Sequence, residues 1–146
     1  MSNSASYAGD IEVEAAWKAL AEDPKAILVD VRTHAEWSYV GVPLLDRSDR
    51  DVLLVEWLSY PDMNVHVDFA EKLLAELEMR NVTKDSPIYF LCRSGVRSRH
   101  AAIEMTPRWE GPCYNVASGF EGDLDDALHR SGSNGWKHAG LPWRQF

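Results

Sequence analysis

The sequence predicts an α/β domain built on a mostly parallel sheet with helices on both faces. Two short apolar runs, Ala26 to Val31 and Pro87 to Cys92, are typical of strands buried on both faces. The segment from Val67 to Met79 repeats apolar residues at helical spacing, and other helix-forming segments separate the expected strands. Strands that alternate with helices in this way usually lie parallel to one another, with the connecting helices packed on the sheet.

Each expected element has a local reason in the sequence. Val13 to Ala21 is rich in helix-forming residues. Thr33 can cap a short helix from His34 to Tyr39, with Glu36 completing a capping box, and Asp68 can cap the helix that runs to Met79. The remaining expected elements are strands at Val52 to Trp57 and Cys113 to Val116, a helix from Ser98 to Met105, and a helix with an acidic first turn from Glu121 to His129.

Length and composition restrict the classes of function. A chain of 146 residues is about one domain, and we expect a flexible N-terminus at 1–8 followed by one domain at 9–146. The formal net charge of −8 argues against a nucleic-acid partner, and no apolar run approaches the length of a membrane span. Two cysteines and the lack of a secretory-signal pattern favour a reducing compartment, so we expect a cytoplasmic protein.

Cys92 is the strongest candidate for a reactive side chain. It ends an expected strand and precedes a turn and a helix, and ligands of parallel sheets bind beyond the carboxyl ends of the strands. The start of a helix, together with Arg93 and Arg97, favours a thiolate, and Gly95 lets successive N–H groups point inward around an anion. The same loop supplies two hydroxyl donors, Ser94 and Ser98. We therefore expect an activated nucleophile; the simpler alternative is a cysteine buried for packing alone.

Four segments then follow one another in a characteristic order. They are Asp30-Val31-Arg32 with Glu36-Trp37, the loop from Cys92 to Arg97, the segment Gly119 to Asp123, and the segment Gly135 to Trp143. Together they resemble a single-domain rhodanese, a sulfurtransferase. The resemblance implies a five-stranded parallel sheet. It also implies that Cys92 takes a sulfane sulfur from a small anionic donor such as thiosulfate. The resulting persulfide would pass the sulfur to cyanide or to a small-molecule or protein thiol. The residues expected to bind the donor are Arg93, Ser94, Gly95, Val96 and Arg97.

The length of the loop separates the relatives of this family. Related cysteine phosphatases carry five residues between the cysteine and the arginine, whereas four stand between Cys92 and Arg97. A shorter loop suits a single terminal sulfur or a sulfonate, so sulfur transfer is favoured over phosphatase or arsenate reductase activity. A non-catalytic module for anion binding, sensing or docking is the other alternative, because such a loop binds anions whether or not its cysteine reacts.

The remaining candidates have supporting roles. We expect Asp30 and Arg32 to form an ion pair that fixes neighbouring loops, and Ser98 to support the cysteine loop. Cys113 is expected to be a buried strand thiol. No cysteine or histidine has metal-ligand spacing, so we expect neither a metal nor another cofactor. The family pattern changes at Val40 to Leu45, where Gly-His-Ile-Pro-Gly-Ala is usual, and we expect altered local packing there rather than lost chemistry.

Overall fold

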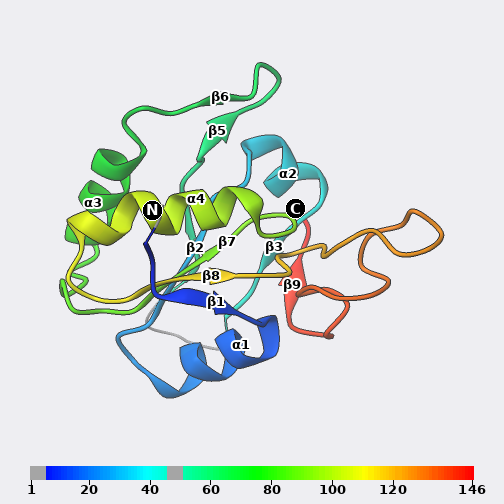
Figure 1. Ribbon diagram of the computed structural model, residues 1–146, viewed down its shortest axis with the longest axis horizontal. Coiled ribbons are helices and arrows are strands. Elements are labelled where there is room, and N and C mark those ends of the chain that lie inside the picture. Colours follow the sequence, from blue (N-terminus) through cyan, green and yellow to red (C-terminus); the bar gives the residue numbers. More distant parts are fainter. Residues whose placement is uncertain (1–5, 46–50) are drawn as a thin grey trace.

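A five-stranded parallel sheet forms the centre of the computed structural model, which describes residues 6–45 and 51–146 (Figure 1). Its strand order is β1-β8-β7-β2-β4, and all four pairings are parallel. This arrangement confirms the predicted fold class. The strands are β1 Gly9–Ile11, β2 Ile27–Asp30, β4 Leu53–Leu54, β7 Ile88–Leu91 and β8 Cys113–Val116.

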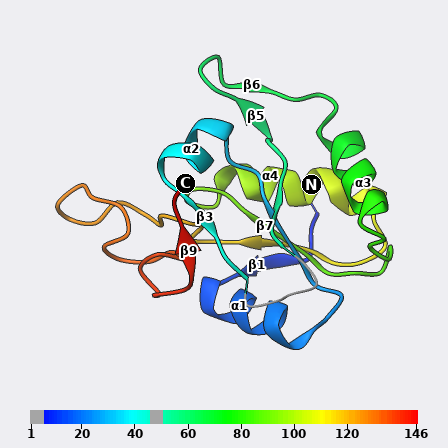
Figure 2. The same ribbon diagram turned by 180° about the vertical axis from the view of Figure 1, so that it is seen from behind.

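Helices cover both faces of this sheet. One face carries α1, and the other carries α3 and α4 (Figures 1 and 2). The capping box that opens α2 is present as predicted, because Thr33 and Glu36 exchange hydrogen bonds. Asp68 occupies the N-cap position of α3 but its side chain accepts no capping hydrogen bond. The helices are α1 Val13–Glu22, α2 His34–Tyr39, α3 Phe69–Met79 and α4 Val96–Met105, the last followed by a 3₁₀ turn at Thr106–Arg108.

The continuous apolar run that predicted β7 is explained by its burial on both faces. Ile88 and Phe90 point into the cluster under α3 and α4, whereas Tyr89 and Leu91 point into the cluster under α1. Because successive side chains of a strand point to opposite faces, a strand covered on both sides needs apolar residues at every position. The loop that follows β7 is therefore anchored at the centre of the molecule.

Two small antiparallel pairs lie outside the main sheet. Val42–Pro43 (β3), within the segment that departs from the family pattern, pairs with Trp143–Arg144 (β9). Leu58–Ser59 (β5) and Asn64–Val65 (β6) form a hairpin that stands away from the layered body at the top of Figure 1. The sequence had predicted only one strand in that region, from Val52 to Trp57. Its pairing with β2 is confined to Leu53 and Leu54.

The predicted helix from Glu121 to His129 is wrong. This segment forms successive turns, and Leu128 has a positive φ of 64°. The Asp125 carboxylate accepts the backbone N–H groups of Ala127 and His129, both at 2.9 Å. Asp side chains compete with helical hydrogen bonds in this way, which explains why an acidic start did not begin a helix here.

The N-terminal boundary expected from the sequence falls partly outside the described residues, which begin at Ser6. The Ala8 N–H already donates to the Cys113 carbonyl at 2.8 Å, just before β1 begins at Gly9. Among residues 6–45 and 51–146, no helix has both the length and the apolar character needed to cross a membrane.

Candidate active site

Cys92 lies at the carboxyl end of β7, in the middle of the sheet. Its sulfur accepts the Gly95 N–H at 3.1 Å, and the Ser98 hydroxyl oxygen also lies 3.1 Å from it. The residue is only 1% exposed, so the sulfur sits beneath the loop rather than on the surface. Two donors therefore face the sulfur from the loop and from the first turn of α4.

Gly95 gives the loop its shape. It has φ 109° and forms the N-cap of α4, which begins two residues earlier than the sequence predicted. A Cβ at this position would lie 2.0 Å from the Ala117 carbonyl oxygen, so the loop packs directly on the turn that follows β8. That turn also holds the loop by hydrogen bonds, because the Phe120 N–H donates to the Cys92 carbonyl at 2.8 Å.

A buried polar chain runs from the sulfur to the first strand. The Ser98 hydroxyl lies 2.6 Å from the Asn115 Oδ1, and the Asn115 amide donates to the Gly95 carbonyl at 3.1 Å and to Asp10 at 3.0 Å. Those two acceptors fix the orientation of the amide, so its Oδ1 must face Ser98. A hydroxyl has one hydrogen, and Asn115 therefore competes with the Cys92 sulfur for it.

Arg97 faces a carboxylate. It makes a bidentate ion pair with Glu36 at 2.6 and 2.9 Å, and both side chains are mostly buried. Burial opposes the charged form of Glu36, but the hydrogen bonds and charge of Arg97, with hydrogen bonds from Thr33, lower its pKa to about 2. Burial likewise opposes the charge on Arg97, yet Glu36 raises its pKa, with smaller contributions from Cys92 and Asp30. The guanidinium is thus held beside the cysteine loop.

Asp30 and Arg32 form the ion pair that the sequence predicted. Both side chains are fully buried, and the guanidinium donates to the carboxylate at 2.8 to 3.1 Å. It also donates to the Gly41 carbonyl at 2.7 Å and lies 4.2 Å from the centre of the Phe120 ring. The pair therefore connects the end of β2 with the start of β3 and with the segment that supports the cysteine loop.

A pocket of about 490 Å³ opens beside the loop. Of the predicted donor-binding residues, Arg93 and Arg97 line it, whereas Ser94, Gly95 and Val96 do not, and neither does Cys92. Arg93 is exposed, Ser94 is half-buried and Val96 is exposed. The other walls come from α2, from the turn between β5 and β6, and from the segment after β8.

Sequence reasoning missed several residues of this site. Glu36 was assigned only to a helix cap, and Asn115 was read as part of a strand. Glu121 and Arg130, which line the pocket, fell within or beside a helix that does not form. The sequence held a signal for Glu36 alone, because Glu36-Trp37 belongs to one of the four segments that carry the family resemblance. Among the described residues, no group of three or more histidine, cysteine, aspartate or glutamate side chains could hold a metal ion.

Comparisons with known proteins show the family to which the chain belongs. Residues 12–125 match the family described as Rhodanese-like domain. The uncharacterized protein RC0915 of Rickettsia conorii is 37% identical over 129 residues, which cover 88% of this chain and 91% of the relative. The crystal structure of Rv0390 from M. tuberculosis has a TM-score of 0.83 at 48% identity and covers 97% of this chain and 100% of that one. The polysulfide-sulfur transferase homodimer from Wolinella succinogenes has a similar fold, with a TM-score of 0.59 at 20% identity over 94% of this chain and 78% of its own. The chain belongs to the rhodanese-like domain family.

Proposed function

We propose that the protein is a sulfurtransferase of the rhodanese type, with Cys92 as its nucleophile. The observation that carries this proposal is the position of the Cys92 sulfur, which accepts the Gly95 N–H and lies 3.1 Å from the Ser98 hydroxyl oxygen, beneath an arginine-flanked loop. Equivalent donors would stabilise negative charge on that sulfur and on a persulfide built upon it. The chemistry needs no cofactor, because the cysteine itself carries the transferred atom.

In the proposed reaction the Cys92 thiolate attacks the outer sulfur of thiosulfate. The new bond joins Sγ to that sulfur, the sulfur–sulfur bond of the donor breaks, and sulfite leaves with the electron pair. Cyanide or a thiolate then attacks the outer sulfur of the persulfide, and the electrons of the broken bond return to Sγ. No oxidant or reductant is consumed.

The remaining residues of the loop would bind the donor anion or support the loop. The N–H groups of Val96, Arg97 and Ser98 precede the first intrahelical bond of α4, which runs from Arg99 to Gly95, so they point toward the loop and favour an anion there. Arg93 adds positive charge for the donor, Arg97 lies beside the loop in its pair with Glu36, and Ser94 adds a hydroxyl. The supporting residues Asp30, Arg32 and Ser98 hold the surrounding segments.

A second candidate function is anion binding without sulfur transfer, in a sensing or docking module. The burial of Cys92, which is only 1% exposed, favours this alternative because a donor must reach the sulfur past the loop. In such a module the loop would hold an oxyanion while the thiol stays unmodified. Phosphatase and arsenate reductase activities are disfavoured by the short loop.

Sulfur loading tests the proposal directly. The reduced protein is incubated with thiosulfate and, separately, with polysulfide, the substrate class named for the Wolinella succinogenes protein. Intact mass under non-reducing conditions should show one added sulfur atom in the wild type and none in Cys92→Ser. A wild type that gains no sulfur from any donor refutes the proposal. If that protein, and also Cys92→Ser, still bind thiosulfate, the binding module is the correct function.

We propose that the protein acts in the cytoplasm, where its two free cysteines would stay reduced and thiol acceptors are present.

A further inference from the structure

The Ser98 hydroxyl has two acceptors within reach and one hydrogen to donate. Its oxygen lies 2.6 Å from Asn115 Oδ1 and 3.1 Å from the Cys92 sulfur. The first distance is shorter than the usual value of about 2.7–2.8 Å for a hydroxyl and an oxygen acceptor. A neutral sulfur is only a weak acceptor. The hydrogen therefore points to Asn115 while the sulfur of Cys92 carries no charge.

A negative charge on the sulfur reverses this preference. Hydrogen bonds to an ionised acceptor are roughly twice as strong as neutral ones. The hydroxyl needs only to turn about its C–O bond, because both acceptors already lie within reach of its oxygen. Ser98 and Asn115 are both buried, so bulk water does not replace either partner. The Ser98 hydrogen can therefore follow the charge on Cys92 without a movement of the backbone.

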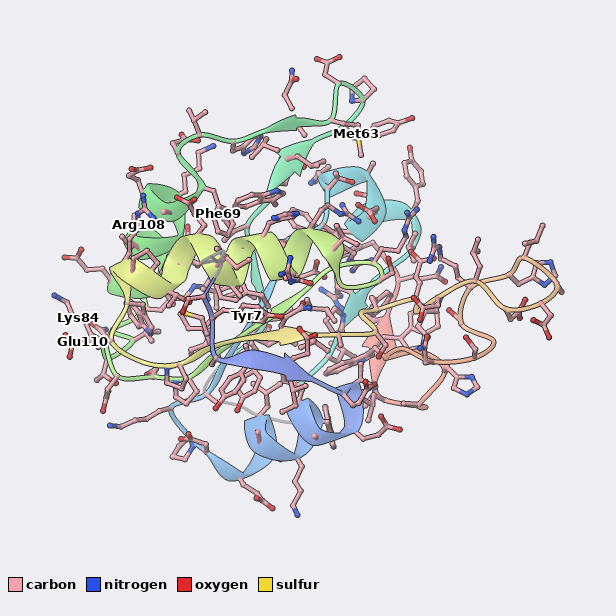
Figure 3. All side chains as sticks on the ribbon, viewed as in Figure 1. Tyr7, Met63, Phe69, Lys84, Arg108 and Glu110 are labelled. Carbon is pink, nitrogen blue, oxygen red and sulfur yellow. The ribbon has the colours of Figure 1, made fainter. Side chains whose placement is uncertain are left out.

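Asn115 is held in an orientation that presents its carbonyl oxygen to the hydroxyl. Its amide donates to Asp10 on β1 at 3.0 Å. Asp10 also accepts the Tyr7 hydroxyl at 2.7 Å, and Tyr7 lies beneath α4 in the view of Figure 3. The Arg99 guanidinium, on α4, lies 5.6 Å from the centre of the Tyr7 ring. The outer end of this polar chain is thus fixed between β1 and α4, which keeps the amide from turning over.

We propose that Asn115 is a positioning residue that controls the charge on Cys92 through the Ser98 hydroxyl. While the sulfur is neutral, Asn115 Oδ1 takes the hydrogen of the hydroxyl. When the thiol proton leaves to water, that hydrogen turns to the sulfur and stabilises the thiolate, and the bond to Asn115 is lost. Ser98 therefore favours ionisation of the thiol, and Asn115 opposes it.

The consequence for turnover rests on the proposed function of Cys92. The hydrogen lies on Sγ while the thiolate attacks the donor, because Sγ is then negative. Once the Sγ–S bond has formed, the charge lies on the outer sulfur and the hydrogen returns to Asn115. It turns back to Sγ as the acceptor breaks that bond and the electron pair returns to Sγ. Ser98 thus assists both the loading and the discharge of the cysteine.

The pH dependence of Cys92 alkylation measures the charge on its sulfur, because only the thiolate reacts. The rate with iodoacetamide is followed by peptide mass in the folded protein. Ser98→Ala removes the hydrogen that follows the charge, so the midpoint of the profile should rise by about one half to one pH unit. Ser118→Ala is the matched control and should not move it. Ser118 is also buried, but its hydroxyl donates to Glu12 at 3.3 Å.

The charged groups of the surrounding elements are the same in all these variants. They are Arg93 in the loop, Arg97 on α4 with Glu36 on α2, Asp30 and Arg32 at the end of β2, and Asp10 on β1. A difference between the profiles therefore reports the hydroxyl and its acceptor rather than a changed charge.

Asn115→Leu should move the midpoint in the opposite direction. Leucine keeps the branched shape but offers no acceptor, so the Ser98 hydrogen is left to the sulfur and the midpoint should fall by about half a pH unit. The former partners of the amide are not stranded. The Gly95 carbonyl still accepts the Arg99 N–H at 3.3 Å, and Asp10 is exposed. Asn115→Ala, which has no atoms that could clash, should give the same direction and replaces leucine if that variant does not fold.

The double variant decides whether Asn115 acts through Ser98. In Ser98→Ala, the further change Asn115→Leu should leave the midpoint where it is, because the hydrogen through which Asn115 acts is gone. An upward shift by Asn115→Leu alone would overturn the proposal. So would an equal shift with and without Ser98, because Asn115 would then act only by supporting the fold around the sulfur.

Sulfur transfer is measured separately, so that this inference and the proposed function can fail independently. Ser98→Ala should slow thiosulfate loading and discharge to cyanide by about three- to tenfold at pH 7, and Ser118→Ala should slow neither. A protein that loads no sulfur but shows the expected alkylation shifts refutes the sulfurtransferase and keeps the role of Asn115. One that loads sulfur while the two substitutions act additively on alkylation keeps the role of Cys92 and refutes that of Asn115.

Discussion

The two ends of the central sheet each hold a buried cysteine, and the two sulfur atoms meet opposite surroundings. Cys92 follows β7 and Cys113 begins β8, and each is 1% exposed. The Cys92 sulfur faces the N–H of Gly95 and a hydroxyl at 3.1 Å, whereas the Cys113 sulfur lies 3.9 Å from a carbonyl oxygen. Burial raises the pKa of Cys113 to about 11. Equally buried sulfur atoms therefore have different polar neighbours.

The direction of the strands explains this difference. At the carboxyl end of a parallel strand the chain turns into a helix N-terminus, whose first N–H groups lack intrahelical partners and favour an anion. At the amino end, Cys113 follows the loop after α4, and the Gly111 carbonyl faces its sulfur. Burial opposes ionisation of this thiol, and the hydrogen bond with Thr106 offsets that effect only in part. The position along a parallel strand, rather than depth in the core, distinguishes the reactive candidate from the structural one.

The largest expected effect on sulfur loading comes from adding one methyl group to a glycine near one of the two cysteines. A Cβ at Gly95 would lie 2.0 Å from the Ala117 oxygen, and one at Gly111 would lie 2.2 Å from the Ser86 oxygen. Gly95→Ala and Gly111→Ala should each lose about 1–3 kcal/mol of unfolding free energy in urea, because backbone must shift to make room. Gly95 also has a positive φ, which adds strain to the first variant.

Sulfur loading should divide these two variants. The rate per folded molecule should fall about 10- to 100-fold in Gly95→Ala, because the donor N–H and the sulfur are displaced together. In Gly111→Ala it should stay within about threefold of the wild type, since that clash lies at the Cys113 end. Intact mass after timed thiosulfate incubation gives both rates. An equal loss in the two variants would mean that the loop geometry has no special role.

Sequence alone identified the features of this site that are local along the chain. The strand β7, the turn at Gly95 and the capping box of Thr33 and Glu36 each depend on neighbouring residues, and all were predicted. The Glu36–Arg97 pair joins residues 61 positions apart, and it forms because β2 and β7 are neighbours in the sheet. No periodicity or spacing contains that information. Asn115 was missed for the same reason, since its partners lie on β1, α4 and the cysteine loop.

Two ion pairs, one at each end of α4, differ in burial and therefore in their expected contribution to stability. Glu36 pairs with Arg97 in the first turn and is mostly buried, whereas Glu104 pairs with Arg108 beyond the last turn, where the two side chains are 39% and 42% exposed. A folded pKa of about 2, against 4.5 without the protein environment, means that the Glu36 contribution is complete above pH 4.5 and is lost as the pH falls toward 2. Glu36→Gln should therefore cost about 3 kcal/mol at pH 7 and about half of that at pH 3.

Urea unfolding at several pH values measures this contribution, with Glu104→Gln as the matched control. Exposed pairs contribute little, so the control should lose less than about 1 kcal/mol at either pH. If both variants lose the same amount, or if the Glu36→Gln loss does not shrink on acidification, the pair by the cysteine loop is no stronger than a surface pair.

The smallest expected effect is that of Cys113→Ala. The sulfur at the amino end of β8 takes no part in the proposed transfer, so loading at Cys92 should stay within about twofold, and the lost packing should cost about 1 kcal/mol.

Alkylation of the folded wild type gives the complementary test, because only the thiolate reacts. With a pKa of about 11, Cys113 has roughly one thiolate in a thousand molecules at pH 8, and its labelling by iodoacetamide should rise only as the pH approaches 11. Cys92 should be labelled first at pH 8, as seen by peptide mass, and both cysteines should react in urea. Since the two residues are equally buried, equal labelling of the folded protein would show that accessibility, and not the end of the strand, governs the reactivity of these thiols.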